Sequence, residues 1–240
     1  MDLSTTYLGL RLPHPLMPGA SPLTENLDVV RRLEDAGAAA IVLPSLFEEQ
    51  VTGEQLATHH YLESSSESFA EALTYLPHHP ELTLGPEQHL EYTRRVKEAV
   101  DVPVIASLNG TTHSGWLTFA GLLEEMGADA LELNMFQVPV DPTESGELIE
   151  ARMLEVVQAV VGTVDIPVAV KLSAFHTSIA HFARRLDEEG TSGLILFNRF
   201  HEVDIDAPNL EVVPTLRLSD PTELHARLTW LSILASQVST

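Results

Sequence analysis

Cysteine is absent from the 240-residue chain, and basic side chains are scarce: 13 lysines and arginines stand against 35 aspartates and glutamates. The lack of cysteine excludes disulfides, thiolate metal sites and a cysteine nucleophile, and it leads us to expect a reducing, cytoplasmic location. The formal charge of −22 disfavours nucleic acid and anionic membranes as partners, because both are bound through clustered lysine and arginine. Long apolar runs are also missing, and residues 1–12 lack the pattern of a signal peptide, so no membrane association is predicted.

The composition nevertheless predicts a single globular domain over residues 1–240, because 44% of the residues are apolar. Short β-rich runs alternate with amphipathic stretches, which is the pattern of parallel strands joined by crossover helices. The strands are expected at Leu16–Ala20, Ala39–Leu43, Val102–Leu108, Ala130–Met135, Val168–Leu172 and Gly193–Phe197. The helices are expected at Asn26–Ala36, Glu87–Val100, Gly115–Met126, Glu147–Val161, Ile179–Glu189 and Pro221–Gln237.

Two sequence patterns alternate along the chain. The first joins a helix end, a glycine C-cap and a strand, and its copies begin at Leu33, Leu123 and Leu186. The second ends a helix with Val-Asp and begins a strand with proline, at Val100–Pro103 and Val164–Pro167. Alternating βα units of this kind predict an α/β fold of the TIM (β/α)8-barrel type.

Two insertions interrupt these units, at about residues 47–85 and 201–220, and the second holds a candidate hairpin of Leu210–Val213 and Leu216–Ser219. The remaining residues, about 180, make roughly six βα units of about 30 residues each. We therefore expect an incomplete barrel with about six of the eight units, short at its C-terminus. The alternative is a finished six-stranded open sheet, whose two edge strands would need covering.

Polar side chains stand at the ends of four predicted strands. Asn109, Asn134 and Asn198 end three of them, and Lys171 lies near the end of a fourth. Ligands of such sheets bind beyond the carboxyl ends of the strands, so these groups are predicted to meet at one mouth and hold a planar, electron-rich ring. The structural alternative is that the asparagines only form turns and that Lys171 pairs with Glu132 on the neighbouring strand.

Metal and nicotinamide sites are not predicted. His59-His60 and His78-His79 lack the spacing and the carboxylate that helical zinc sites favour. Pro18–Ser21 brings backbone close to the predicted rim, but the chain has no glycine-rich dinucleotide fingerprint or phosphate-cradling loop.

Four segments together resemble the dihydroorotate dehydrogenase family of FMN-dependent barrels in order and spacing: Leu16–Ser21, Leu131–Asn134, Val168–Ser173, and Phe197-Asn198 followed by Asp204–Asp206. The resemblance implies an oxidoreductase, a flavoprotein of pyrimidine biosynthesis, that transfers hydride from a dihydropyrimidine-like CH–CH substrate to flavin. It further implies a homodimer, a small-molecule substrate, and FMN over the barrel mouth. The FMN would lie near Ala20, Ser21, Asn109, Asn134, Lys171 and Asn198.

The chain departs from the family pattern at three places. The catalytic base, normally cysteine or serine on the loop after the fourth strand, falls near Gln137, whose amide cannot accept the proton, so the catalytic residue is unassigned. Pro44-Ser45 stands where the family has an active-site lysine. The family's Gly-Gly phosphate-binding turn belongs to the two βα units that the repeat count does not find.

Two further readings of the chain therefore stay open, and with them the question of whether it is an enzyme. One is a catalytically impaired relative or fragment that acts through a protein partner. The other is a flavin-free lyase that uses Lys171 as a Schiff-base nucleophile.

Overall fold

The computed structural model describes residues 1–47, 86–109, 112–135, 141–198, 203–214 and 220–240. The chain divides into two compact units, one of residues 1–5 and 11–131 and the other of residues 6–10 and 132–240, and each is described by itself. The single domain over residues 1–240 stays a prediction.

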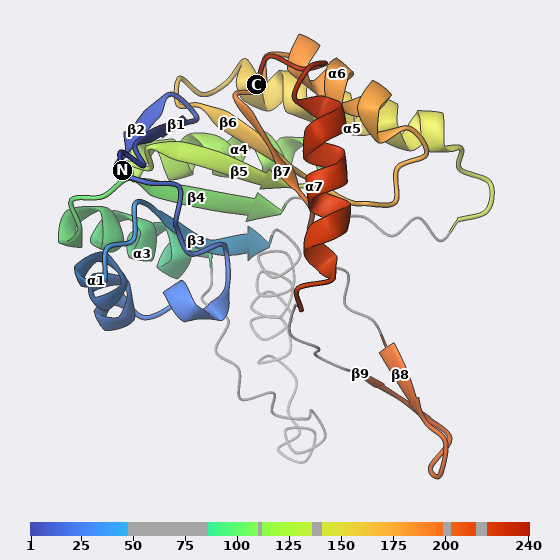
Figure 1. The fold of residues 1–240 in the computed structure, drawn as a ribbon, viewed down its shortest axis with the longest axis horizontal. Coiled ribbons are helices and arrows are strands. Elements are labelled where there is room, and N and C mark those ends of the chain that lie inside the picture. Colours follow the sequence, from blue (N-terminus) through green and yellow to red (C-terminus); the bar gives the residue numbers. More distant parts are fainter. Residues whose placement is uncertain (48–85, 110–111, 136–140, 199–202, 215–219) are drawn as a thin grey trace, which may run out of the picture. The chain divides into compact units, whose positions relative to one another are not determined.

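Five parallel strands form the main sheet, in the order β3-β4-β5-β6-β7 (Figure 1). They are β3 (Ile41–Phe47), β4 (Val104–Asn109), β5 (Ala130–Asn134), β6 (Val168–Leu172) and β7 (Gly193–Leu196), and the division between the units falls within β5. A two-stranded sheet of β1 (Thr5–Tyr7) and β2 (Leu10–Leu12) precedes them. The α/β class expected from the sequence is therefore confirmed.

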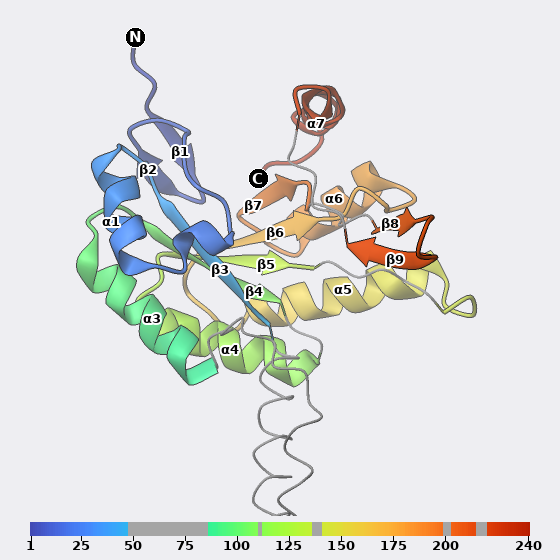
Figure 2. The ribbon, with the colours of Figure 1, turned by 90° about the horizontal axis from the view of Figure 1, so that it is seen from below.

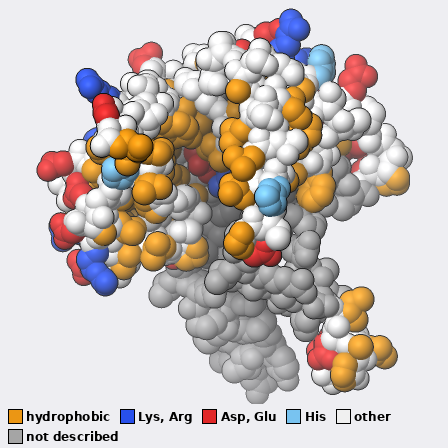
Figure 3. All heavy atoms as spheres, in the orientation of Figure 1, with side chains coloured by type: hydrophobic (Ala, Val, Ile, Leu, Met, Phe, Trp, Pro, Cys, Tyr) orange, Lys and Arg blue, Asp and Glu red, His pale blue; other side chains and the backbone are white. Residues whose placement is uncertain are grey.

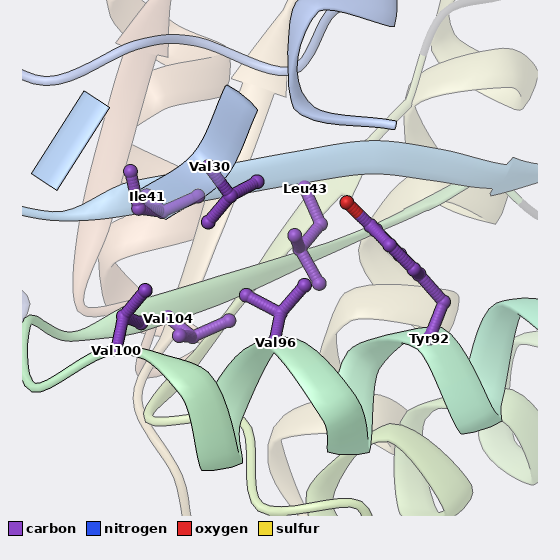
Figure 4. Close-up of a cluster of buried hydrophobic side chains, with 7 residues drawn as sticks. All are labelled: Val30, Ile41, Leu43, Tyr92, Val96, Val100 and Val104. Atoms are coloured by element: carbon purple, nitrogen blue, oxygen red, sulfur yellow. The ribbon is translucent and has the colours of Figure 1, made fainter. Parts of the chain in front are cut away.

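The first unit surrounds β3 and β4 with α1 (Leu27–Asp35), α3 (Pro86–Ala99), α4 (His113–Glu125) and the short 3-10 helix η1 (Pro22–Thr24). Tyr92, Val96 and Val100 recur every four residues, so they form one stripe, and Figure 4 shows this stripe pointing from α3 toward the two strands. The core that results is completed by residues of α1, β3 and β4: Val30, Ile41, Leu43 and Val104.

Hydrogen bonds join η1 to this core. The Tyr92 hydroxyl donates to the Thr24 carbonyl at 2.8 Å, and the Thr24 hydroxyl donates to the Val42 carbonyl at 2.9 Å. Both bonds are buried, where an unpaired polar group is costly, so they hold η1 against α3 and β3.

The second unit contains α5 (Gly146–Val161), α6 (Ile179–Glu188), α7 (Glu223–Leu234) and the hairpin of β8 (Val203–Asp206) and β9 (Glu211–Pro214). Figure 2 shows α6 beside β6 and β7. Helix α6 buries the stripe Ile179, Phe182, Ala183 and Leu186. Helix α7 packs Trp230 and Leu234 on α6 and β7, while Leu224, Leu228 and Leu231 form an exposed apolar row that is visible along the helix in Figure 3.

The repeated helix ends are confirmed at atomic detail. Gly37, Gly127 and Gly190 each follow a helix and adopt a positive φ, at 93°, 90° and 87°. In the first copy, Gly37 N–H donates to the Glu34 carbonyl and Ala38 N–H donates to the Leu33 carbonyl, and the other two copies repeat both bonds. This is the Schellman motif, which favours glycine because only glycine adopts that backbone conformation without strain.

One prediction about strands is wrong, and a second falls partly outside the described residues. Residues 16–20, predicted as the first strand, form none, because Pro15 and Pro18 have no N–H to donate to a ladder; a single bond from Ala39 N–H to the Leu16 carbonyl remains. The strand near Val212 is β9 and pairs with β8; its predicted partner, Leu216–Ser219, lies outside the described residues, so that pairing stays a prediction. Of the six strands predicted for the main sheet, five are present among the described residues.

The six predicted helices agree with the structure to within a few residues at each end. Among the described helices, none combines the length and apolar character that crossing a membrane requires.

Candidate functional site

A buried ion pair links the carboxyl-terminal part of β6 to β5 in the second unit. Lys171 Nζ lies 3.0 Å from Glu132 Oε1, and the two side chains are 16% and 5% exposed. Every residue of β5 is buried, including Glu132. The Glu132 carboxylate is therefore shielded from water and needs a hydrogen-bonding or charged partner within the protein. The pairing named from the sequence as the structural alternative for Lys171 is therefore present.

Two asparagines meet at the carboxyl ends of the strands in this unit. Asn198 Nδ2 donates to Asn134 Oδ1 at 2.6 Å, although the two residues are 64 positions apart. Asn134 ends β5 and is 8% exposed. Asn198 lies two residues beyond β7, and its backbone N–H donates to the Leu172 carbonyl at 2.7 Å, which continues the β6–β7 pairing and fixes the start of its side chain.

The turn between β1 and β2 packs against the same pair of strands nearer their amino ends. A Cβ built on Gly193 would lie 2.6 Å from Leu8 Cδ2 and 3.8 Å from both Tyr7 Cε2 and Ala169 Cβ. Gly193 is opposite Ala169 in the register of β6 and β7. Ala169 and Lys171 share one face of β6 because side chains alternate along a strand, so Tyr7 and Leu8 form a floor on the face that carries Lys171.

Tyr7 lies within electrostatic reach of the ion pair. Burial, and secondarily the negative charge of Glu132, raise the pKa of Tyr7 to about 12. The phenol therefore stays neutral across the physiological range. Along this face the order from amino to carboxyl end is Tyr7 and Leu8, then Glu132 and Lys171, then Asn134 and Asn198.

This arrangement offers both donors and acceptors above the ion pair. The bond to Glu132 uses one of three N–H donors on the ammonium, and among the described residues none accepts from the other two. Asn134 keeps its NH₂ group and Asn198 keeps its carbonyl oxygen, given the amide orientations that their mutual bond requires. The donor set fits the edge of a planar ring that carries carbonyl oxygens and an N–H, as the isoalloxazine of FMN does.

The other predicted site residues lie in the first unit or outside the described residues. Asn109 ends β4, two pairings beyond Ser45 and Ser107, whose hydroxyls are 2.8 Å apart. Ala20 and Ser21 precede η1, where the Ser21 carbonyl accepts from the Thr24 backbone and hydroxyl. Whether these three line the same mouth as Lys171 stays a prediction. Gln137 and the two histidine pairs fall outside the described residues.

Comparison with known proteins gives relatives along most of the chain. The catalytic subunit of a dihydroorotate dehydrogenase B (NAD(+)) from Pyrococcus abyssi is 29% identical over 213 residues, which are 85% of this chain and 64% of the relative. The corresponding subunit from Thermoplasma acidophilum is 26% identical over 215 residues, 86% of this chain and 66% of its own. The chloroplastic dihydropyrimidine dehydrogenase (NADP(+)) of Arabidopsis thaliana is 28% identical over 227 residues, 89% of this chain and 52% of its own.

In sequence, the chain is dihydroorotate dehydrogenase-like. No family model matches it. The dihydroorotate dehydrogenase-like chain spans about two thirds of the length of the dihydroorotate dehydrogenases that it matches. Among solved structures, an IMP dehydrogenase/GMP reductase-like protein from Corynebacterium glutamicum covers 83% of this chain and 49% of its own, at 14% identity and a TM-score of 0.49.

Sequence reasoning missed the floor residues Tyr7 and Leu8. The sequence of the dihydroorotate dehydrogenase-like chain does carry a signal for them, because Leu8-Gly9 separates two short alternating segments; in the structure both residues have positive φ, at 52° and 74°. Such a two-residue turn indicates a β-hairpin. The sequence does not show where that hairpin packs.

A buried histidine beside the loop after β6 was also missed. His176 Nδ1 lies 3.6 Å from Glu150 Oε1 of α5, and its ring lies 4.4 Å from that of Phe182 of α6. Burial lowers the pKa of His176, and its Nε2 has no hydrogen-bond partner among the described residues. These contacts lie toward α5 and α6, so we interpret His176 as an anchor of the loop.

Proposed function

We propose that the chain is an FMN-dependent oxidoreductase that transfers hydride from a dihydropyrimidine-like CH–CH substrate to flavin. The observation that carries this proposal is the meeting of Asn134, Asn198 and Lys171 on one face at the carboxyl ends of β5 to β7. The names of the relatives support the reaction class, since they are dihydroorotate and dihydropyrimidine dehydrogenases.

The wider setting is part of the same proposal. The parallel sheet would belong to a (β/α)8-type barrel, with Ala20, Ser21 and Asn109 lining the flavin site together with the three residues of the second unit. The protein would act in the cytoplasm, in pyrimidine biosynthesis, on a small-molecule substrate, and as a homodimer.

The chain's own residues would bind and orient the ring. The Asn134 NH₂ group would donate to a ring carbonyl, and the Asn198 carbonyl would accept a ring N–H. The Lys171 ammonium would face a ring atom that gains negative charge, where a charge-assisted hydrogen bond contributes about 1.5–3 kcal/mol. Bound FMN supplies the hydride acceptor, a chemistry that no side chain of the protein provides.

Flavin titration tests the proposal directly. We expect the purified protein to bind FMN, seen as quenching of flavin fluorescence, and Lys171→Met to weaken binding by about ten- to hundredfold, the equivalent of one charge-assisted bond. Asn134→Ala should weaken it about tenfold. The matched control is Asn209→Ala, which removes an exposed asparagine of the β8–β9 turn and should leave binding unchanged. Absence of FMN binding by the unaltered protein would refute the proposal.

A catalytically impaired relative, acting through a protein partner, is the second candidate. One observation favours it: the position of the base falls near Gln137, and an amide cannot accept the proton of the substrate C–H. Anaerobic addition of dihydroorotate, and separately of dihydrouracil, to the FMN complex distinguishes the two. Bleaching of the visible flavin absorbance supports the dehydrogenase, whereas bound flavin that neither compound reduces supports the impaired relative.

A further inference from the structure

The chain uses lysine at only two positions, 97 and 171, although it has eleven arginines. Each lysine pairs with an acidic side chain of its own unit. Lys97 Nζ lies 2.7 and 2.5 Å from the two carboxylate oxygens of Asp129, and Asp129 also accepts the Val104 N–H at 2.7 Å. The first pair therefore joins α3 to the start of β4, which is a structural role.

The second pair differs from the first in burial and in what surrounds it. Lys97 and Asp129 are 34% and 27% exposed, whereas Glu132 is almost fully enclosed. Tyr7 and Leu8 close the space on its amino-end side, and Asn134 follows it on the same face of β5. A carboxylate in such a place is costly to desolvate, and a buried ion pair seldom contributes net stability compared with apolar residues of similar size. A role at the site accounts for a charge that stability alone does not require.

The geometry of the ammonium indicates what that role is. Lys171 has a flexible four-carbon stem and three donors, so it does not by itself hold one direction. The bond to Glu132 directs one ammonium donor toward the neighbouring strand β5. Tyr7 and Leu8 occupy the space on the amino-end side of the ammonium. The remaining donors are left for a molecule bound beside Asn134 and Asn198.

We propose that Glu132 is a positioning residue of the site, which acts by holding the Lys171 ammonium in the place where it contacts the bound ring. This inference rests on the proposed function, because only that proposal identifies the bound ring as the isoalloxazine of FMN. In this proposal Glu132 bonds the ammonium and not the ring, so its effect on binding is expected to pass through Lys171.

A double-mutant cycle on oxidised FMN tests this route. We expect Glu132→Gln to weaken FMN binding about tenfold and Lys171→Met to weaken it by about ten- to hundredfold. The double variant should bind no more weakly than Lys171→Met alone, because Glu132 has nothing to position once the ammonium is gone. Glu132→Asp keeps the carboxylate, and it should recover at least half of the loss on a logarithmic scale. Additive losses in the cycle would overturn the proposal, since they would mean that Glu132 acts by a separate, structural route.

Amine acetylation provides a second measurement that needs no flavin. With acetic anhydride in limiting amount, mass spectrometry follows Lys171 and Lys97 in the same molecule, and Lys97 is the internal control. We expect Glu132→Gln to raise the acetylation rate of Lys171 at least fivefold and to leave that of Lys97 unchanged, with Glu132→Asp in between.

The two measurements separate the two hypotheses. If the unaltered protein does not bind FMN, the proposed function fails, and acetylation still decides whether Glu132 restrains Lys171. Equal changes at both lysines, or no change at Lys171, would overturn the positioning role even in a protein that binds FMN.

Discussion

Gly193→Ala is the sharpest test of the floor beneath the ion pair. The added Cβ would lie 2.6 Å from Leu8 Cδ2, whereas carbon atoms in contact are about 3.5–4.0 Å apart. Leu8 is 5% exposed, so its side chain has to shift within a buried site to admit the added methyl group. Overpacking of this kind costs about 1–3 kcal/mol, which is the destabilisation that we expect.

Urea unfolding, followed by far-UV circular dichroism, measures this cost. Leu8→Ala alone should destabilise the protein by about 2–5 kcal/mol through the lost side chain. The double variant should be more stable than the sum of the two changes predicts, by at least about 1 kcal/mol, because the alanine at 193 then enters the space that Leu8 has left. Gly146→Ala is the matched control, since its Cβ would meet only Thr177 Oγ1 at an ordinary 3.7 Å. A Gly193→Ala protein as stable as the unaltered one, or strict additivity with Leu8→Ala, would refute the packing described here.

Three further predictions concern stability in the first unit. Gly127→Ala should destabilise by about 1 kcal/mol because its φ is 90°, whereas Gly121→Ala, inside α4 with open space around it, should stabilise by about 0.5–1 kcal/mol; thermal unfolding that shifts both variants in one direction contradicts this. Asp129→Asn should cost about 1.5–3 kcal/mol, seen in urea unfolding, because it removes the carboxylate that pairs with the partly exposed Lys97, and a loss below about 1 kcal/mol argues against that role. Burial lowers the pKa of His89 to about 4, so the unfolded chain takes up a proton first as the pH falls. Stability should therefore decrease by about 3 kcal/mol between roughly pH 6.5 and 4, relative to His89→Leu, and equal pH profiles of the two proteins contradict the assignment.

Local sequence patterns predicted much of the fold, since each acts within a few residues. The Schellman glycines at 37, 127 and 190 follow from the need for a positive φ after a helix. The buried strands β5 and β6 follow from short apolar runs between turn residues. The same reasoning failed at Leu16–Ala20, where an apolar run also occurs but the prolines remove the donors that a strand needs.

The candidate site, too, could be predicted from the sequence only in part. The alternation of a strand places Glu132 and Asn134 on one face, and the pairing of Lys171 with Glu132, which the sequence offered as the structural alternative, is present in the structure. The bond between Asn134 and Asn198 depends on where the chain turns after β7 and joins residues 64 positions apart, so spacing alone could only suggest it. The contact of Leu8 with Gly193 spans most of the chain and leaves no periodic trace in the sequence.

Binding and catalysis make separate demands on this chain. The groups that would hold a ring come from three consecutive βα units and are supported by buried contacts: the Glu132 carboxylate, the backbone bond from Asn198 to Leu172, and the floor under Ala169. In the proposed function the proton acceptor would come from a different segment, near Gln137, whose side chain cannot do that chemistry. A chain can therefore keep the ring contacts after losing the base, because no residue serves both purposes. For this reason flavin binding and substrate oxidation have to be measured as separate properties, and a positive result for the first does not establish the second.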